Sequence, residues 1–289
     1  MLPAGANDLV LTHDILVEGV HFLPADPPAD VAWKLVAVNL SDLAGKGARP
    51  TGVLLGYTLK GDAAWDAAFV AGLGRALAAM DVPLLGGDTV GYAGGPRVLS
   101  ITAIGEAPAG GAPSRGGARP GDRIWVSGTI GDAGLGLRIA RQGIHGPKAL
   151  ADRYRRPVPR VALGQAIARH VTAMMDVSDG LLIDLKRLAD ASGVAATLDL
   201  DSVSLSASYR QQAGADRAAR LSAATSGDDY ELLFTASPEA DASLRTRAAL
   251  IDVPLTPIGR IGEGLGLIMR DAEGWVPLPP RLGYEHGAH

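Results

Sequence analysis

Apolar residues recur along the chain in two different rhythms, which indicates a mixture of strands and helices. Alternation of apolar and polar positions predicts strands at 8–12, 50–59 and 97–105. Apolar residues spaced three or four apart predict helices over 28–45 and 62–80. The first helix opens with prolines and Asp30, which suit a first turn, and Asp62 is placed to cap the second. The first part of the chain is therefore predicted to be mixed α/β.

A stretch rich in Gly, Pro and Ala, at 107–122, interrupts this pattern, and the strand DRIWVSG follows it. Further helices are predicted near 131–142, 159–171 and 179–192, and further strands at 195–200, 230–236 and 255–261. A chain of 289 residues exceeds the roughly 250 at which a single core usually stops growing. We therefore predict two α/β domains with mixed sheets, at 1–118 and 119–289.

Composition and charge narrow the classes of function. Hydrophobic residues make up 47% of the chain and charged residues 20%, the balance of an ordinary globular protein. The net charge of −4 gives no basic surface for nucleic acid, and the lack of Cys removes disulfides and thiolate chemistry. No segment approaches the ~20 apolar residues of a membrane span, and the first residues lack signal-peptide character. We therefore expect a cytoplasmic protein with no nucleic-acid or membrane partner.

Short segments rich in Asp, Gly and Ser stand at the junctions of the predicted elements. They are THD with Asp14, NLSD with Asp42, GGDT with Asp88, DVSDG with Asp176 and Asp179, and SGDDYE with Asp228 and Asp229. Any one of them has a local explanation, because these residue types favour turns and helix caps. Asp179, for example, stands where the helix GLLIDLKRLAD needs an N-cap.

Three of these aspartates, Asp14, Asp88 and Asp176, follow apolar runs. This pattern places them near the C-terminal ends of strands, where α/β folds gather ligand sites. Mg²⁺ takes oxygen ligands and shares its shell among carboxylates, waters and substrate phosphates, so dispersed single aspartates suit it. The recurrence of such aspartates favours a magnesium-dependent site over a series of unrelated turns.

Familiar signatures of other enzyme classes are absent from the sequence. It has no Gly-x-x-x-x-Gly-Lys-Ser/Thr loop, no Gly-x-Ser-x-Gly elbow and no His-Glu-x-x-His helix. Four histidines stand in contexts that favour a solvated surface role: His145, His170, His286 and His289. His21, in VEGVHF, presents a polar ring beside Phe22. Its ring has two alternative roles at this point, a structural hydrogen bond or a contact with a ligand.

Longer motifs, taken together, resemble the thiamine-monophosphate kinase family. They run in order over essentially the whole chain: HDILVEGVHF at 13–22, KLVAVNLSDLAGKGARP at 34–50, LLGGDTVG at 84–91, RPGDRIWVSGTIGDAGLGL at 119–137, RYRRPVPR at 153–160, MDVSDGLLIDL at 175–185, SGDDYELLF at 226–234 and GYEH at 283–286. The set also distinguishes the chain from the related aminoimidazole ribonucleotide synthases and selenophosphate synthetases.

This resemblance implies two domains of the aminoimidazole ribonucleotide synthase-like fold, with the N-terminal domain binding ATP and metal and forming a homodimer. It implies transfer of the ATP γ-phosphoryl group onto thiamine monophosphate, which gives thiamine diphosphate. It implies several Mg²⁺ ions held by Asp14, Asp42, Asp88, Asp176 and Asp179. It also implies ATP contacts from Gly87, Asp88, Arg115 and Ser178, and a thiamine site lined by His21, Asp228 and Tyr284.

The chemistry of such a reaction suits these residue types. The acceptor is a phosphate monoester that is already anionic, so no residue is assigned as a general base or covalent nucleophile. The difficulty is to bring two anions into line, which metal ions held by carboxylates and an arginine relieve. A carboxylate such as Asp228 near the cationic thiazolium or the aminopyrimidine, with the ring of Tyr284, is sensible pairing for thiamine.

Two features depart from the family pattern. A Gly-Asp-Asp-Ala-Ala segment, which supplies further carboxylates ahead of the VEGVHF motif in the family, is absent, and MLPAG fits just after it. Met1 is therefore expected to correspond to an internal residue of a longer protein. His13 stands where the family more often has Thr, and we expect it to act on the backbone rather than to abolish activity.

Two other functions stay open at this point. One is a sister ATP-using enzyme of the same fold that activates a different oxygen, such as an amide oxygen, although VEGVHF and GDDYEL argue against it. The other is a nucleotide- or thiamine-binding protein whose catalysis is impaired by loss of the leading Gly-Asp-Asp segment. ADP formation with and without thiamine monophosphate separates all three.

Overall fold

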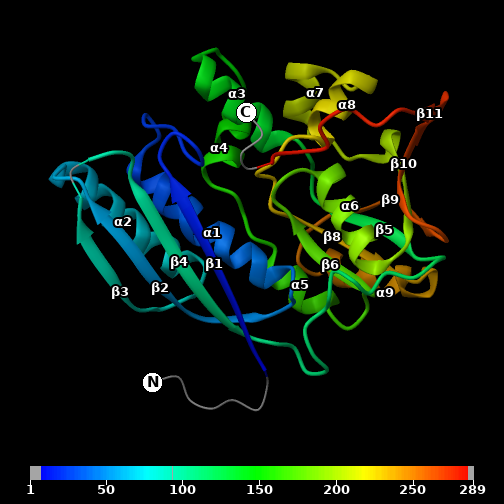
Figure 1. Cartoon of the computed structure of the whole chain (residues 1–289), viewed down its shortest axis with the longest axis horizontal. Coiled ribbons are helices and arrows are strands. Elements are labelled where there is room, and N and C mark those ends of the chain that lie inside the picture. Colours follow the sequence, from blue (N-terminus) through cyan, green and yellow to red (C-terminus); the bar gives the residue numbers. More distant parts are fainter. Residues whose placement is uncertain (1–7, 93, 286–289) are drawn as a thin grey trace.

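The computed structural model describes residues 8–92 and 94–285, which form two α/β halves joined by the segment 107–122 (Figure 1). The N-terminal half, up to residue 106, holds a four-stranded sheet in the order β1-β4-β2-β3. Its strands are β1 (Leu9–Val17), β2 (Arg49–Leu59), β3 (Leu84–Gly91) and β4 (Val98–Glu106). Strand β2 pairs in parallel with β3 and antiparallel with β4, and β4 pairs antiparallel with β1.

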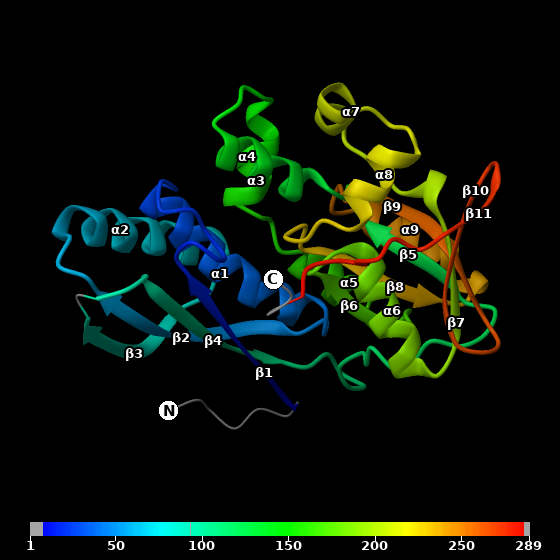
Figure 2. The same cartoon turned by 45° about the horizontal axis from the view of Figure 1, so that its top comes forward.

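Two long helices, α1 (Pro28–Ala44) and α2 (Ala63–Ala79), cover one face of this sheet, and no described element covers the other face (Figure 2). Strand β1 shows the resulting alternation. Leu16 is buried in the core that includes α1, whereas Leu11 and Ile15 are 62% and 46% exposed. A single chain therefore leaves an apolar sheet face open to water.

The C-terminal half, from residue 123, is built on a seven-stranded mixed sheet in the order β11-β10-β7-β9-β5-β8-β6. Its strands are β5 (Arg123–Ser127), β6 (Ala173–Val177), β7 (Ala195–Asp199), β8 (Glu231–Ala236), β9 (Leu255–Gly262), β10 (Gly266–Asp271) and β11 (Gly274–Val276). One buried cluster packs α3 and α6 against this sheet, and a second packs α5 and α9.

The helices of this half are α3 (Asp132–Gln142), α4 (Lys148–Arg155), α5 (Val161–Ile167), α6 (Leu181–Ser192), α7 (Ala207–Ala213), α8 (Arg217–Ala224) and α9 (Asp241–Ala249). Two 3-10 turns lie at Leu200–Ser202 and Pro238–Ala240. In the ranges that the structure describes, no helix combines the length and the apolar composition needed to cross a membrane.

Helix α1 joins the two halves along its length. Its last turn lies against α5 so closely that a Cβ atom added to Gly164 would stand 2.1 Å from the Ala44 carbonyl oxygen. Only glycine allows this approach of the two backbones. Nearer its start, the Trp33 indole donates to the Pro157 carbonyl oxygen at 2.8 Å. The position of α1 is therefore fixed by the C-terminal half as well as by its own sheet.

The helices and strands predicted from periodicity are confirmed, and the differences concern lengths and short elements. Strand β1 continues to Val17, beyond the predicted end at residue 12, because its pairing with β4 continues to that point. Periodicity does not identify the short elements α4, α7, α8, α9, β10 and β11. The domain boundary predicted after residue 118 falls inside the joining segment and stays a prediction.

The structure bears on some of the other single-residue expectations. His145 is exposed and His170 partly exposed, as a surface role requires. The His13 ring, on β1, forms a hydrogen bond of 2.8 Å with the hydroxyl group of Thr102 on β4. The MLPAG segment, His286 and His289 lie outside the described residues.

The prediction that Asp179 caps the helix α6 is wrong. Gly180 holds the N-cap position, and no side-chain cap bond forms there. Asp184, inside the first turn, instead accepts from the backbone N–H groups of Ser178, Asp179 and Gly180 at 3.1, 3.0 and 3.3 Å. Because Asp184 satisfies these donors, the Asp179 side chain is available for other contacts.

The Asp62 cap of α2, which the sequence predicts, is confirmed, and it gives a stability prediction. The carboxylate accepts from the Trp65 N–H at 3.0 Å. Asp62→Ala leaves that donor without its cap, and we expect the free energy of unfolding, measured in urea, to fall by about 1 kcal/mol. Asp190→Ala, which removes an exposed carboxylate paired with Lys186 on α6, is the control and should lower it by about 0.5 kcal/mol or less. Equal losses in both variants would contradict the cap.

Candidate functional site

The NLSD segment at the end of α1 contacts carboxylate-bearing strands of both halves. The Asn39 side-chain oxygen accepts from the Asp14 backbone N–H at 3.0 Å, which fixes β1 against the helix. The Ser41 hydroxyl donates to Asp176, near the end of β6, at 2.6 Å. The Asp42 carboxylate accepts a hydrogen bond from the Thr12 hydroxyl group on β1. One turn of α1 therefore brings carboxylates from distant parts of the sequence together.

These carboxylates crowd negative charge into a partly buried space. Burial, followed by the charges of Asp42 and Asp179, raises the pKa of Asp14 to about 6. Burial, followed by the charge of Asp42, raises the pKa of Asp176 to about 8, although the hydrogen bond from Ser41 opposes that shift. The acidic cluster, defined as Asp14, Asp42, Asp176 and Asp179, therefore favours a bound cation, which would offset the repulsion.

The ligand chemistry of the acidic cluster fits Mg²⁺, because carboxylate oxygens are the protein ligands that this ion prefers. Across residues 8–92 and 94–285, no group of three or more His, Asp or Glu side chains is placed to hold a metal ion. A set of fewer than three protein ligands is compatible with Mg²⁺, which usually keeps waters and substrate phosphates in its shell. The cluster therefore suits metal ions that arrive with, or are completed by, a phosphate chain.

Lys46 lies beside the acidic cluster, and Arg115 lies near Lys46. Lys46, in the turn after α1, is within electrostatic reach of the cluster and of Arg115. Burial, followed by the charge of Arg115, lowers the pKa of Lys46. The Lys46 ammonium donates to the Pro113 carbonyl oxygen at 3.4 Å, in the segment that carries Arg115. An anionic ligand at the cluster would therefore meet positive charge on this side.

The loop 178–180 connects the acidic cluster to residues predicted for ATP and thiamine. Its Ser178 carbonyl oxygen accepts from the Asp228 N–H at 2.7 Å, and its Asp179 carbonyl oxygen accepts from the Tyr284 N–H at 2.8 Å. The Asp179 carboxylate pairs with Arg187 on α6. The structure therefore gathers Ser178, Asp179, Asp228 and Tyr284 around one loop.

His21 and Asp228 are brought together by Lys34, a buried lysine on α1. The Lys34 ammonium donates to the His21 carbonyl oxygen at 3.0 Å and to the Asp228 carboxylate at 2.8 Å. The His21 ring accepts from the Val17 N–H at 3.0 Å, so the structural hydrogen bond foreseen for it is present. Asp228 is already part of an ion pair, and it does not stand as an isolated anion.

Gly87 and Asp88 lie apart from the acidic cluster. They are on β3, the edge strand opposite β1, and pairing through Ile101 and Leu55 separates Asp14 from Gly87 by three strand spacings, about 14 Å. Asp14 and Asp88, predicted near the C-terminal ends of strands, each lie within a strand that ends three residues later, at Val17 and Gly91. Within one chain, Asp88 is the predicted metal ligand that the fold does not bring to the others.

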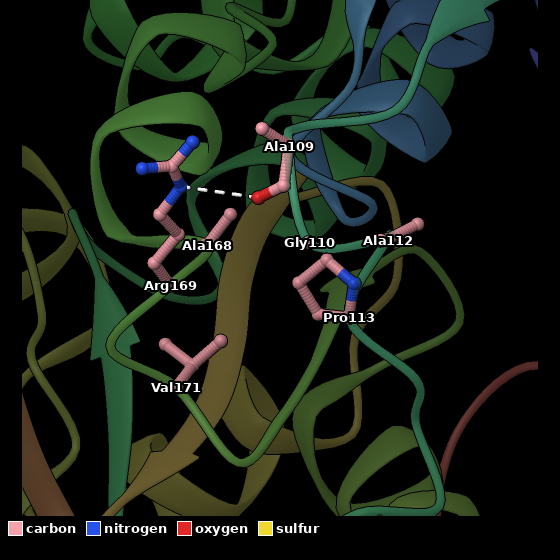
Figure 3. A pocket seen from close by; sticks show the side chains of 8 residues that line it. Ala109, Gly110, Ala112, Pro113, Ala168, Arg169 and Val171 are labelled. Atoms are coloured by element: carbon pink, nitrogen blue, oxygen red, sulfur yellow. Dashed lines mark hydrogen bonds between the residues drawn. The ribbon is translucent and has the colours of Figure 1, made fainter. Parts of the chain in front are cut away.

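A hollow of about 650 Å³ lies beside the joining segment (Figure 3). Small and apolar residues line it, together with Arg169, whose Nε donates to the Ala109 carbonyl oxygen at 3.1 Å. None of the predicted site residues lines it. The hollow lies between the joining segment and the end of α5, and its lining residue Pro113 accepts from Lys46.

The charged residues around the candidate site that are not identified from the sequence include Lys34, Lys46 and Asp184. Lys34 lies among the buried positions of α1, so the available signal was a charge where the helical pattern demands an apolar residue. Asp184 gives the same signal inside GLLIDL, and it is fully buried. Lys46 gives none, because the glycines around it already indicate a turn.

Comparison with known proteins finds relatives over almost the whole chain. The family model for the AIR synthase related protein, N-terminal domain, matches residues 2–107, and the model for the C-terminal domain matches residues 119–271. Thiamine-monophosphate kinase of Caulobacter vibrioides is 43% identical over 287 residues, which cover 97% of this chain and 81% of that protein. The protein of the same name from Escherichia coli K12 is 39% identical, over 97% of this chain and 87% of that protein.

Solved structures share the fold as well. Thiamine-monophosphate kinase from Stenotrophomonas maltophilia K279a matches with a TM-score of 0.86 at 42% identity, covering 92% of this chain and 86% of that one. AaThiL complexed with AMPPCP and TMP matches with a TM-score of 0.83 at 31% identity, covering 98% and 89% of the two chains. The mixed α/β fold predicted from the sequence is thereby confirmed. By sequence and by fold, this chain belongs to the thiamine-monophosphate kinases within the AIR synthase related family.

Proposed function

We propose that this protein transfers the γ-phosphoryl group of ATP to thiamine monophosphate, producing ADP and thiamine diphosphate. The observation that carries the proposal is the acidic cluster at the junction of the halves, with Lys46 beside it and Arg115 near Lys46, in a chain of this family. The complex of AaThiL with AMPPCP and TMP, in a chain 31% identical to this one, supports it. The protein is accordingly a phosphotransferase whose acceptor is a phosphate group.

Several Mg²⁺ ions are the cofactor in this proposal. Their ligands are Asp14, Asp42, Asp88, Asp176 and Asp179. Bound Mg²⁺ supplies charge neutralisation and alignment of the reacting phosphates. Arg115, Ser178 and the backbone at Gly87 contact ATP, and Arg115 adds positive charge where the nucleotide phosphates lie. The carboxylates of this chain determine where the Mg²⁺ charge is held, because α1 and β6 fix them before any ligand binds.

His21, Asp228 and Tyr284 form the acceptor side of the site. Asp228 and Tyr284 are bonded to the loop 178–180, and His21 is joined to Asp228 through Lys34. The Tyr284 side chain is 42% exposed and offers a ring face to a heterocycle. Since the acceptor phosphate is ionised before it attacks, these residues have to bind and align it rather than remove a proton.

A homodimer completes the site in this proposal. The bare face and edges of the N-terminal sheet expose a set of apolar residues, each 40–62% exposed: Leu9, Leu11, Ile15, Leu54, Leu84, Leu85 and Val90. Monomers rarely leave so large an apolar face open, and a second copy of the chain is its fitting cover. If the β3 edge of one copy lies beside the β1 edge of the other, Asp88 of the first reaches the acidic cluster of the second.

The alternatives foreseen from the sequence fit less well. A sister enzyme acting on another oxygen would have to share 43% identity with a thiamine-monophosphate kinase while using a different acceptor. An impaired binding protein has no need for the crowded carboxylates of the acidic cluster, which strain the fold without a cation. A cytoplasmic location belongs to the proposal, because ATP is one of its substrates.

Asp42→Asn tests the metal assignment. The amide keeps an acceptor for the hydroxyl group on β1 but removes one negative charge from the acidic cluster. We expect kcat at saturating Mg²⁺ to fall about 100-fold or more. Because a repelling charge has been removed, the Tm should stay equal or rise. Asp190→Asn, on the exposed surface of α6, is the control, and wild-type turnover of the Asp42 variant would exclude the assignment.

A mixed dimer tests whether the site is shared between two copies. In a heterodimer of Asp42→Asn and Asp88→Asn chains, a shared arrangement puts both defects into one site and leaves the other site intact. Isolated through two different affinity tags, this heterodimer should show about half of the wild-type activity, although each parent homodimer is nearly inactive. A site built within one chain gives two defective sites instead. An inactive heterodimer with an unchanged Tm would therefore refute the role of Asp88 across the interface.

Thiamine monophosphate, and not free thiamine, is the predicted acceptor. An alcohol must lose a proton as it attacks, and in this proposal the carboxylates of the site are assigned to metal and acceptor binding, which leaves none as a base for that step. We expect ADP formation with the monophosphate and essentially none with thiamine. Tyr284→Ala should raise the KM for thiamine monophosphate about five-fold and leave the KM for ATP nearly unchanged, since one aromatic contact contributes on the order of 1 kcal/mol. Efficient phosphorylation of thiamine would overturn the proposal.

A further inference from the structure

Lys34 is a charged residue in the interior of the molecule. Only 2% of its side chain is exposed. Its ammonium meets groups from three separate segments: the His21 carbonyl oxygen at 3.0 Å, Asp228 Oδ2 at 2.8 Å and the Tyr154 ring, whose centroid is 4.4 Å away. A buried ammonium is tolerated only where its charge is paired and its hydrogens are bonded. The buried Lys34 ammonium therefore needs these partners for its own stability. In return, its contacts hold together the loop after β1, the turn before β8 and helix α4.

The Asp228 carboxylate is held at both of its oxygens. Oδ2 accepts from Lys34, and Oδ1 accepts from the Tyr230 hydroxyl at 3.1 Å. The backbone of Asp228 has a φ of 70°, and that of Tyr230 has a φ of 51°, a left-handed conformation that is uncommon for residues other than glycine. Such a turn persists only where its surroundings determine it. The Asp228 carboxylate consequently has one defined orientation.

We infer that Lys34 is a positioning residue for the acceptor, which holds His21 and Asp228 in one arrangement across the two halves. By compensating the charge of Asp228, it also directs this carboxylate to bind the exocyclic amine of the aminopyrimidine rather than the cationic thiazolium. The inference rests on the proposed function of the same site. A carboxylate has about four lone-pair positions, so after the bonds from Lys34 and Tyr230 it can still accept from an amine. A cationic ring gains less from a carboxylate that already belongs to an ion pair.

The competing explanation is that Lys34 only ties the two halves together. Arg155 and Asp26 provide a matched comparison, because their ion pair of 2.8 Å also joins the halves, and neither residue is a partner of His21 or Asp228 in the contacts described. Arg155→Met should therefore lower the Tm while leaving the KM for thiamine monophosphate within about two-fold of wild type. Lys34→Met likewise replaces a long charged side chain by an uncharged one of similar length. It should raise the KM for thiamine monophosphate much more than Arg155→Met does.

The test is a double-mutant cycle read on the KM values for both substrates. We expect Lys34→Met and Asp228→Asn each to raise the KM for thiamine monophosphate about ten-fold and to change the KM for ATP by about two-fold or less. In the double variant, the two effects should not multiply, because Lys34 acts through Asp228. Each single variant leaves the charge of the other residue buried without its ion-pair partner, whereas the double variant removes both charges. The double variant can therefore be measured even if a single variant folds poorly. Multiplicative effects, or an unchanged KM in folded Lys34→Met, would overturn the inference.

A second measurement addresses the amine directly. An acceptor analogue in which oxygen replaces the exocyclic amine should bind wild type about ten-fold more weakly than thiamine monophosphate, measured by calorimetry, and should show no such difference in Asp228→Asn. Equal binding of the two ligands by wild type would exclude recognition of the amine. If wild type forms no thiamine diphosphate at all, the proposed function fails. If it does and these variants behave like wild type, only the role of Lys34 fails.

Discussion

A single turn of α1, bonded to both halves of the molecule, determines the arrangement of the site. Asn39 fixes the backbone of β1, Ser41 fixes a carboxylate of β6, and Asp42 lies between them. These bonds hold carboxylates together against their own repulsion, which is why burial and neighbouring charge raise the pKa of both Asp14 and Asp176. The fold thus accepts local electrostatic strain where the proposed Mg²⁺-dependent reaction needs negative charge.

The same helix also sets the spacing between the two ends of the site. Lys34, at the proposed acceptor end, and Asp42, at the proposed metal end, are eight residues apart, which corresponds to about 12 Å along the helix axis. Helices hold functional groups more rigidly than loops do. Lys34 therefore holds the loops that carry His21 and Asp228 against α1. In the proposed site, the distance from acceptor to metal then depends on helix geometry rather than on loop conformation.

Much of the fold could be predicted from the sequence because hydrophobic periodicity and capping are local. The Asp62 cap, the long helices and most of the strands follow from residues within a few positions of one another. The site was predictable only in part. The recurrence of Asp residues indicated the chemistry, but strand order is not encoded locally, so the separation of Asp88 from Asp14 could not be foreseen. The α6 cap was mispredicted although it is local, because Asp184, inside the first turn, accepts from the same backbone donors that Asp179 was expected to cap.

The distant position of Asp88 and the bare face of the N-terminal sheet are two consequences of one topology. A four-stranded sheet with helices on one side only must leave its other side and both edges unpaired within the chain. Association through that face would bury the exposed leucines and, at the same time, bring the β3 edge to the β1 edge of another copy. In that arrangement, burial of apolar surface and completion of the metal site are the same event. A chain that failed to associate would then lack Asp88 as a ligand at its acidic cluster, and its apolar sheet face would stay open to water.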